Sequence, residues 1–313
     1  MKKTIIKLSK IIDIIASPFV ILSSIVLKIV RKIGVHRMKL SKIIMDKIGI
    51  FPIIDYYHEP LFKIDQLSSI IGPERNLPGI NFNIDNQLRF IKKFSYTDEF
   101  KNFLNKDFYF GNGSFESGDA EYLYNFIRLK KPKKIIEVGC GFSTLIIQNA
   151  IKQNKIENNN INIEHICIEP YENEYLSNFD LKFKKLKIED VNLDYFKTLT
   201  DNDFLFIDSS HIIRPNGDVL FEILEILPSL KKGVYVHIHD IFSPYDYPKE
   251  WILEKVWFWT EQYLLEAFLT NNNQWEIVGS LYYLKKKHFG IMKSYCKYIT
   301  EKNSPGSIYL KKI

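Results

Sequence analysis

The sequence predicts an α/β fold, in which a seven-stranded and mostly parallel sheet with flanking helices follows an N-terminal helical extension. Two observations predict the sheet. Strand and helix patterns alternate from residue 117 onward, and the strand candidates are short apolar runs, typical of strands buried on both faces. A third observation predicts the extension, because the first fifty residues combine an apolar run with many lysines and arginines.

The composition is that of a globular protein. Hydrophobic residues make up 46% and charged residues 26% of the 313 residues, enough for one large core with an appended region. The cysteines Cys140, Cys167 and Cys296 show no CxxC spacing, so neither a disulfide framework nor a thiolate zinc site is predicted. This pattern favours a reducing, cytoplasmic setting.

The positive charge is concentrated in the first fifty residues. There, eleven Lys or Arg residues face Asp13 and Asp46, a net charge of +9, while the whole chain carries +6 and the remainder therefore −3. The rest of the chain thus lacks the basic surface expected of a nucleic-acid-binding domain. An apolar and basic leader instead predicts association with an anionic membrane surface, at the inner face of the membrane.

Fourteen uncharged residues lie between Asp13 and Lys28, whereas a helix that crosses a bilayer needs about 20. Three alternatives stay open: a helix on the membrane surface, a tilted span, and a helix that packs on the protein or on a partner. Residues 51–116 are punctuated by prolines and contain one predicted helix, at 85–104. We therefore predict a basic apolar leader (1–50), a cap or linker region (51–116) and a cofactor-binding domain (117–313).

The predicted domain consists of alternating strands and helices. Five strand–helix units followed by a closing pair of strands are expected, with long helices after the first, fourth and fifth strands. The predicted strands are 133–139, 161–169, 183–189, 203–208, 233–240, 275–284 and 306–312, and the predicted helices are 143–152, 218–230 and 250–269.

The first of these strands ends in a glycine motif. The segment IIEVGCGFST (135–144) contains Glu137, Gly139, Gly141 and Ser143, and its glycines allow a tight turn and the close approach of a ligand. The third glycine of the dinucleotide pattern GxGxxG is replaced by Thr144. The motif resembles the ExGxGxS/T motif of class I, S-adenosylmethionine-dependent methyltransferases, whose sheet has the same order of elements.

The resemblance implies a role for an acid after each of the next three strands. Glu169, in ICIEP, would bind the ribose hydroxyls, a task that suits a carboxylate because it accepts two hydrogen bonds. Asp190, in EDV, would contact the adenine, and Asp208, in FIDSSH, would lie near the methionine end of the cofactor. Each acid could also be a helix cap, but four matches in succession favour the cofactor site.

The fifth strand ends in HIHDIF, and His239 and Asp240 are expected at the ligand-binding end. His239 or His211 could be the base that activates an acceptor hydroxyl, with a helix cap as the alternative for His211. Alternatively, Asp208, His239 and Asp240 could hold Mg²⁺ or Mn²⁺, as similar acids do in metal-dependent O-methyltransferases. A histidine among these ligands departs from the usual Asp-Asn or Asp-Asp pair.

The segment DSSH (208–211), followed by HIHDIFSPYDYPKEW (237–251) with its aromatic loop, resembles bacterial methyltransferases akin to macrocin-type and other O-methyltransferases of glycan and natural-product pathways, and the resemblance covers residues 105–313. It implies methyl transfer to a hydroxyl of a sugar, a glycan or a small hydroxylated metabolite, with S-adenosylmethionine as cofactor. The charge distribution described above predicts no nucleic-acid partner. Two other functions remain open: a nicotinamide-dependent dehydrogenase, and a membrane-associated, non-catalytic scaffold that keeps only the cofactor fold. Cofactor binding and turnover would distinguish the three.

Overall fold

The computed structural model describes residues 2–63, 67, 71–171 and 179–313, with side chains from residue 8 onward. Residues 64–66 and 68–70 of the predicted cap region lie outside the described residues. The chain divides into two compact units, Met1–Ile70 and Ile71–Ile313. Each unit is described by itself below.

The second unit is built on the predicted seven-stranded sheet. Its strand order is β3-β2-β1-β4-β5-β7-β6, and only β7 runs against its neighbours β5 and β6 among the described strands. The predicted fold class is confirmed. The strands are β1 (Lys134–Val138), β2 (Glu164–Ile168), β3 (Lys182–Lys184), β4 (Phe204–Ile207), β5 (Tyr235–His239), β6 (Trp275–Ser280) and β7 (Ser307–Lys312).

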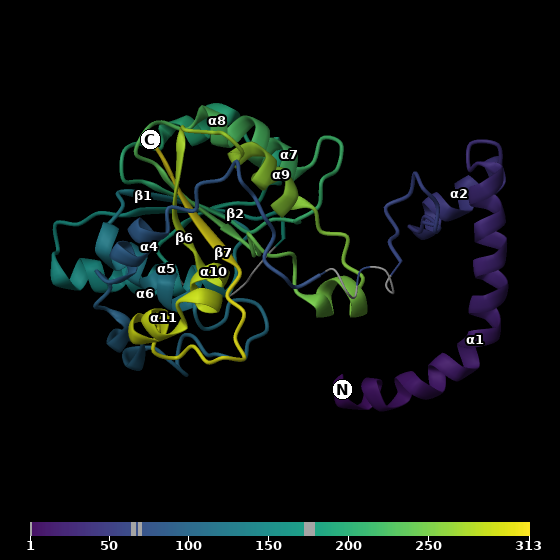
Figure 1. Cartoon of the computed structure of the whole chain (residues 1–313), viewed down its shortest axis with the longest axis horizontal. Helices are drawn as coiled ribbons and strands as arrows, with labels where there is room; N and C mark the ends of the chain where they lie inside the picture. The colour runs from purple at the N-terminus through teal and green to yellow at the C-terminus, as the bar shows by residue number, and fades with distance from the viewer. Residues whose placement is uncertain (1, 64–66, 68–70, 172–178) are drawn as a thin grey trace. The chain divides into compact units, whose positions relative to one another are not determined.

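Helices cover both faces of this sheet (Figure 1). One face packs against α4 (Ile84–Ile91), α5 (Asp119–Lys130), α6 (Phe142–Glu157), α10 (Leu281–Lys287) and α11 (Phe289–Tyr295). The other face packs against α7 (Asp218–Phe221), α8 (Leu227–Ser229) and α9 (Glu261–Leu269). A π-helical segment, Glu222–Ile226, joins α7 to α8 and another spans Glu250–Glu254, and short 3-10 helices occur at Thr97–Asn102, Ile188–Asp190 and Leu193–Thr198.

Two elements differ from prediction where backbone N–H groups donate hydrogen bonds to a side chain or a loop carbonyl that is distant in sequence. The predicted strand 275–284 ends at Ser280, because its N–H donates to the side chain of Gln87 (2.7 Å) and α10 begins at the next residue. The predicted helix 250–269 is broken, and α9 starts at Glu261, where the N–H groups of Thr260 and Glu261 bond to the carbonyl of His211. Both partners are distant in sequence, so local pattern could not reveal them.

Residues 71–116 lie in the same compact unit as the sheet. Phe100, Phe103, Phe108 and Phe115 are buried in the core on the α5–α6 side of the sheet. The boundaries predicted at residues 50 and 116 remain a functional proposal, since the structure places the division near residue 70.

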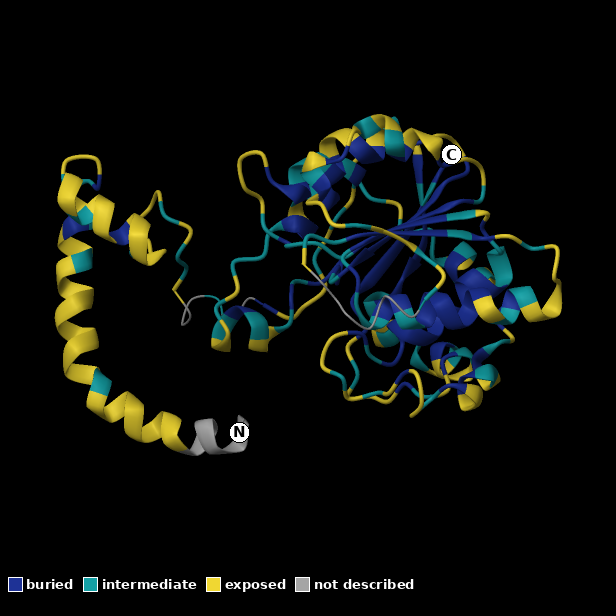
Figure 2. Ribbon diagram, turned by 180° about the vertical axis from the view of Figure 1, so that it is seen from behind, coloured by how far each residue is buried: buried dark blue, intermediate teal, exposed yellow. Residues whose placement is uncertain are grey.

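The described part of the first unit includes the helices α1 (Lys2–Ile33) and α2 (Lys39–Ile48). They pack on each other through Val30, Val35 and Met45, and most other apolar side chains of α1 are exposed (Figure 2). By length and composition alone, Leu8–Ile33 could cross a membrane.

Candidate active site

Two adjoining hollows open at the carboxyl ends of the central strands, of about 350 and 420 Å³. Ligands of open parallel sheets bind at this edge. A larger hollow of about 870 Å³ lies at the opposite edge, around the amino ends of β1, β2 and β4. We place the site at the carboxyl edge because the predicted residues Gly139, Glu169 and Asp208, with Ser209, line both hollows there.

The glycine loop after β1 adopts a conformation that requires glycine at residue 139. Gly139 has a φ of 77°, and a Cβ there would lie 1.9 Å from the carbonyl oxygen of Asp208. Gly141 differs, because a Cβ on it would meet no atom within 4 Å, and it lines the second hollow. Gly139 therefore allows the chain after β1 to pass close to the chain after β4, and Gly141 leaves room for a ligand.

Glu137 supports this loop from inside the protein. Its carboxylate is fully buried and accepts hydrogen bonds from Ser143 Oγ (2.7 Å) and Thr144 Oγ1 (3.0 Å) in the first turn of α6. His165 Nε2 on β2 lies 2.9 Å from the same carboxylate. Glu137 lines neither hollow, so it positions the loop, whereas Ser143 lines the second hollow.

Glu169 follows β2 and faces both hollows. Its carboxylate accepts hydrogen bonds from the backbone N–H of Tyr171 (2.9 Å) and of Cys140 (3.4 Å). These bonds fix the carboxylate beside the glycine loop and leave lone pairs for two hydroxyl groups.

The predicted adenine contact, Asp190, differs in position from its neighbour Glu189. Asp190 is exposed and lies outside both hollows, whereas its neighbour Glu189 is half-buried and lines the first one. The two residues belong to a 3-10 turn, Ile188–Asp190, that the sequence pattern represented as the end of a strand. The turn directs Glu189, rather than Asp190, toward the hollow.

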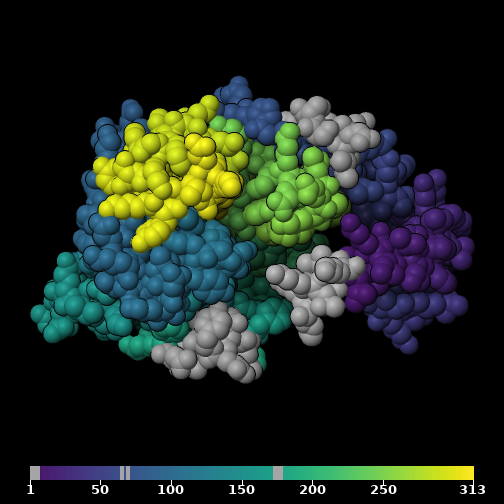
Figure 3. Space-filling model, turned by 90° about the horizontal axis from the view of Figure 1, so that it is seen from below, coloured from purple at the N-terminus to yellow at the C-terminus, as the bar shows by residue number. Residues whose placement is uncertain are grey.

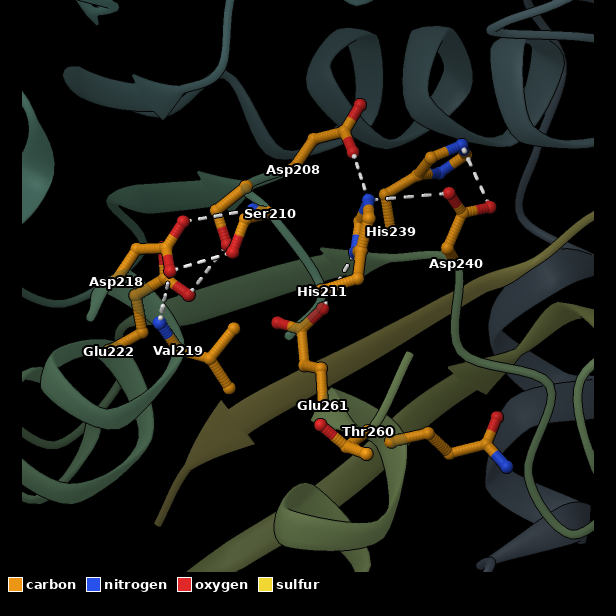
Figure 4. A network of polar contacts seen from close by, with 12 residues as sticks. Asp208, Ser210, His211, Asp218, Val219, Glu222, His239, Asp240, Thr260 and Glu261 are labelled. Atoms are coloured by element: carbon orange, nitrogen blue, oxygen red, sulfur yellow. Dashed lines mark hydrogen bonds and ion pairs between the residues drawn. The ribbon is translucent and has the colours of Figure 1, made fainter. Parts of the chain in front are cut away.

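His211 joins the two acids at the ends of β4 and β5 (Figure 4). Its Nε2 lies 3.3 Å from Asp208 Oδ1 and 3.4 Å from Asp240 Oδ2, and its Nδ1 lies 2.8 Å from Glu261 Oε2. Side-chain exposure decreases from Asp208 (32%) through Asp240 (15%) to His211 (7%). The acids therefore face outward, and the histidine supports them from behind.

The charges of this cluster depend on one another. Burial opposes protonation of His211, but its hydrogen bonds to Asp208 and Glu261 raise its pKa well above the usual value. Burial raises the pKa of Asp240 and of Glu261. Burial would also raise the pKa of Asp208, but the charge of His239 and the hydrogen bond from His211 lower it overall. The carboxylates together stabilise a positive charge at the position between them.

His239 lies beside this cluster rather than inside it. Its Nε2 is 3.7 Å from Asp240 Oδ1, and its Nδ1 is 3.2 Å from Ser307 Oγ, which donates in turn to Asp119. Burial lowers the pKa of His239, but the acids Asp240, Asp208 and Asp119 raise it overall. Burial raises the pKa of Asp119 to about 6.

The structure groups a different histidine with the two acids of the predicted metal set. Ligand atoms of Asp208, His211 and Asp240 lie within 4.8 Å of one another, and His239 is not part of this group. His211 was predicted as a base, but both its ring nitrogens already face carboxylates. His211, His239 and Asp240 line neither of the two hollows, although they adjoin Asp208, which lines both.

Sequence reasoning missed the residues behind the site. Glu261 begins α9, and Ser307 begins β7, where it is the register partner of His239. Phe115, whose ring centroid lies 5.0 Å from that of His239, and Ser114 line the second hollow from the region predicted as a linker. The glycines at 111, 113 and 118 were the signal that could have marked this loop.

The aromatic loop after β5 is partly core. Tyr245 and Tyr247 are buried, while Trp259 packs on His211 with ring centroids 4.3 Å apart. Trp257 stacks on Trp259 (4.5 Å) and is 37% exposed. Figure 3 shows this part of the chain in bright green beside the yellow C-terminal segment. The ring of Phe242 packs on that of Tyr282 in this segment.

Residues 136–241 match the family model described as a methyltransferase domain. The predicted resemblance to methyltransferases is supported for this segment, which carries most of β1, the strands β2 to β5 and most of the residues that line the two hollows.

Individual proteins resemble this chain at low identity or over only part of its length. An uncharacterized protein of Archaeoglobus fulgidus is 33% identical over 144 residues, which are 42% of this chain and 63% of that protein. An O-methyltransferase of Bacillus cereus, solved in complex with SAH, is 10% identical with a TM-score of 0.37, over 80% of this chain and 96% of that one. The O-methyltransferase TomG of Streptomyces achromogenes, involved in tomaymycin synthesis and solved with SAM, is 10% identical with a TM-score of 0.37, over 80% and 94%.

Proposed function

We propose that the protein is an S-adenosylmethionine-dependent methyltransferase that transfers the methyl group to a hydroxyl. The observation that carries the proposal is that two groups of residues lie side by side at one edge of the sheet. A glycine loop with an adjacent carboxylate, Glu169, lies beside the paired acids Asp208 and Asp240. The first feature suits a nucleoside cofactor, and the second suits the activation of a hydroxyl.

The cofactor is assigned to the two hollows. Glu169 accepts hydrogen bonds from the ribose hydroxyls, and Glu189 contacts the adenine. Gly141 leaves space for the methionine part, and Asp208 lies between the cofactor and the acceptor. Methyl transfer forms a bond from the acceptor oxygen to the methyl carbon while the carbon–sulfur bond breaks. The hydroxyl proton must leave to a base, and without a bound cation the carboxylates of Asp208 and Asp240 are the groups placed to accept it.

The residues present also fit a divalent cation. Asp208, His211 and Asp240 offer two oxygens and one nitrogen, and Glu261 orients His211 through Nδ1, as a carboxylate behind a metal-bound histidine does. A mixed oxygen and nitrogen set suits Mn²⁺ better than Mg²⁺. When bound, the cation would supply a Lewis acid that lowers the pKa of the acceptor hydroxyl. We propose that these three residues, not His239, hold it.

The acceptor is proposed to be a sugar, a glycan or a small hydroxylated metabolite. Trp259 packs on His211, and the ring centroids of Trp251, Trp257 and Trp259 lie 4.5–5.2 Å apart. Aromatic faces of this kind pack against the apolar face of a sugar ring or against another ring. A non-catalytic scaffold and a dehydrogenase remain the competing functions.

The first experiment measures binding and turnover together. We expect S-adenosylmethionine to bind in calorimetry and NAD not to bind, and we expect methyl transfer from the labelled cofactor to a panel of glycosides and phenols. EDTA should stop transfer and Mn²⁺ should restore it. Cofactor binding without turnover on any acceptor would favour the scaffold, while turnover that resists EDTA would exclude the cation and leave the carboxylates as bases.

A second experiment tests the glycine loop. Gly141→Val should weaken S-adenosylmethionine binding at least tenfold, about 1.4 kcal/mol, because the new side chain enters the second hollow without touching the protein. Its melting temperature should stay close to that of the wild type. Gly139→Val is the matched control and should lower the melting temperature, since its Cβ collides with the Asp208 carbonyl. Unchanged affinity in Gly141→Val would place the ligand elsewhere.

Residues 1–50 are proposed to bind the anionic inner face of the membrane. Their net charge of +9 and the exposed apolar side chains of α1 support this proposal. The catalytic unit is proposed to act in the cytoplasm.

A further inference from the structure

Six of the polar residues of α1 form a narrow stripe. Lys10, Asp13, Ser17, Ser24, Lys28 and Arg31 follow one another at intervals of three, four or seven residues, which places them on one side of a helix. Val20 occupies the remaining position of this row.

The opposite side of α1 is apolar and exposed over the part of the helix whose side chains are described. Ile11, Ile15, Leu22, Ile29 and Ile33 are 45–66% exposed and follow intervals of four or seven residues, offset from the polar stripe. Packing on α2 covers only Val30 and part of Leu27 near the end of α1. The exposed face is therefore long, continuous and without a partner among the described residues.

The polar stripe favours a helix on the membrane surface over a transmembrane span. The longest uncharged stretch, residues 14–27, has 14 residues, which at about 1.5 Å per residue cover roughly 21 Å of a hydrocarbon core of about 30 Å. A span would also have to bury Asp13 or Lys28. A helix that lies in the interface keeps this stripe in water and buries only the apolar side.

The charge of the unit identifies the occupant of the apolar face. The net charge of +9 over residues 1–50 complements a bilayer that contains anionic lipids. The second helix also exposes apolar side chains, because Leu40, Ile43, Ile44 and Ile48 are exposed on α2. A protein partner would leave most of this positive charge unexplained.

We propose that α1 and α2 form a hairpin that lies in the plane of the membrane surface, with α1 parallel to the bilayer and its polar stripe in water. The proposal deepens the membrane association proposed above and rests on it. It is independent of the methyl-transfer assignment.

The test uses spin labels on single introduced cysteines in the full-length protein. The native cysteines Cys140, Cys167 and Cys296 are buried, so wild-type protein is the control for background labelling. Cysteines are introduced at Ile11, Leu22 and Ile29 on the apolar face and at Ser17 and Ser24 on the polar stripe. Oxygen and a water-soluble nickel complex then report the depth of each label in vesicles of phosphatidylcholine with phosphatidylglycerol.

We expect Ile11→Cys, Leu22→Cys and Ile29→Cys to show one similar, shallow depth, while Ser17→Cys and Ser24→Cys stay in water. Leu22 and Ser24 form the decisive pair, because in a span they would lie at nearly the same depth. A central maximum at Leu22 with Ser24 equally deep would overturn the in-plane hairpin but keep membrane association. Binding should fall on the order of tenfold without phosphatidylglycerol. Absence of vesicle binding would reject both membrane proposals, whatever the methyl-transfer activity.

Discussion

Replacement of Asp240 by asparagine should lower kcat for methyl transfer by roughly two to four orders of magnitude, the range for loss of a general base. The neutral amide can neither accept the acceptor proton nor complete the carboxylate pair around His211. Asparagine is the suitable replacement because Asp240 has a φ of 55°, a left-handed conformation that asparagine tolerates better than most residues. The affinity for S-adenosylmethionine should stay within about twofold, since Asp240 lines neither hollow.

Single-turnover rates, cofactor calorimetry and melting temperature distinguish the possible outcomes. His239→Gln is the companion variant, and we expect a smaller loss of kcat, because His239 contacts Ser307 and lies farther from the acids than His211 does. Asp190→Asn, at an exposed site outside the hollows, is the control and should leave both kcat and affinity unchanged. If Asp240→Asn loses cofactor affinity together with activity, the residue has a structural role, and full activity would remove it from the mechanism.

Removal of the Glu169 carboxylate, in Glu169→Ala, should weaken S-adenosylmethionine binding by about 1.5–3 kcal/mol, the range for hydrogen bonds to a charged group. The loss corresponds to roughly 10- to 150-fold in Kd. The side chain faces both hollows, and its backbone partners Tyr171 and Cys140 hold it in place without help from a ligand. Calorimetry at fixed salt gives the affinity directly.

Two neighbouring variants make this experiment specific. Glu189→Ala should also reduce affinity, whereas Asp190→Ala should not, because only Glu189 lines the hollow. Equal effects at both positions would indicate a general charge effect rather than a contact. An unchanged Kd in Glu169→Ala would exclude this carboxylate from the cofactor site.

The fold and the glycine loop could be predicted because their signals are local. Short apolar strands alternate with helices, and the loop between β1 and α6 follows its strand directly, so the spacing of Gly139, Gly141 and Ser143 carries the information. Strand ends also placed Glu169 and Asp208 correctly at one edge. The register of a parallel sheet brings such residues together without further detail.

The supporting residues could not be predicted because their partners are far apart in the sequence. Glu261 reaches His211 across 50 residues, and His211 itself lies in a loop with a φ of 62°. The choice between His211 and His239 as the histidine facing both acids therefore depended on loop geometry, which periodicity does not encode. Glu189 and Asp190 were confused for a similar reason, since a 3-10 turn replaced the expected strand end.

The antiparallel strand β7 has a consequence for folding during synthesis, because it completes the site and is made last among the strands. Ser307 contacts Asp119 across 188 positions and pairs with His239 on β5, so the support of His239 needs both early and late parts of the chain. Contacts of such long sequence separation form late, after the loop between them has closed. During synthesis the glycine loop and Glu169 can fold before the last strand exists. The cofactor pocket can therefore take shape while the acceptor side is still unfinished, until the C-terminal residues leave the ribosome.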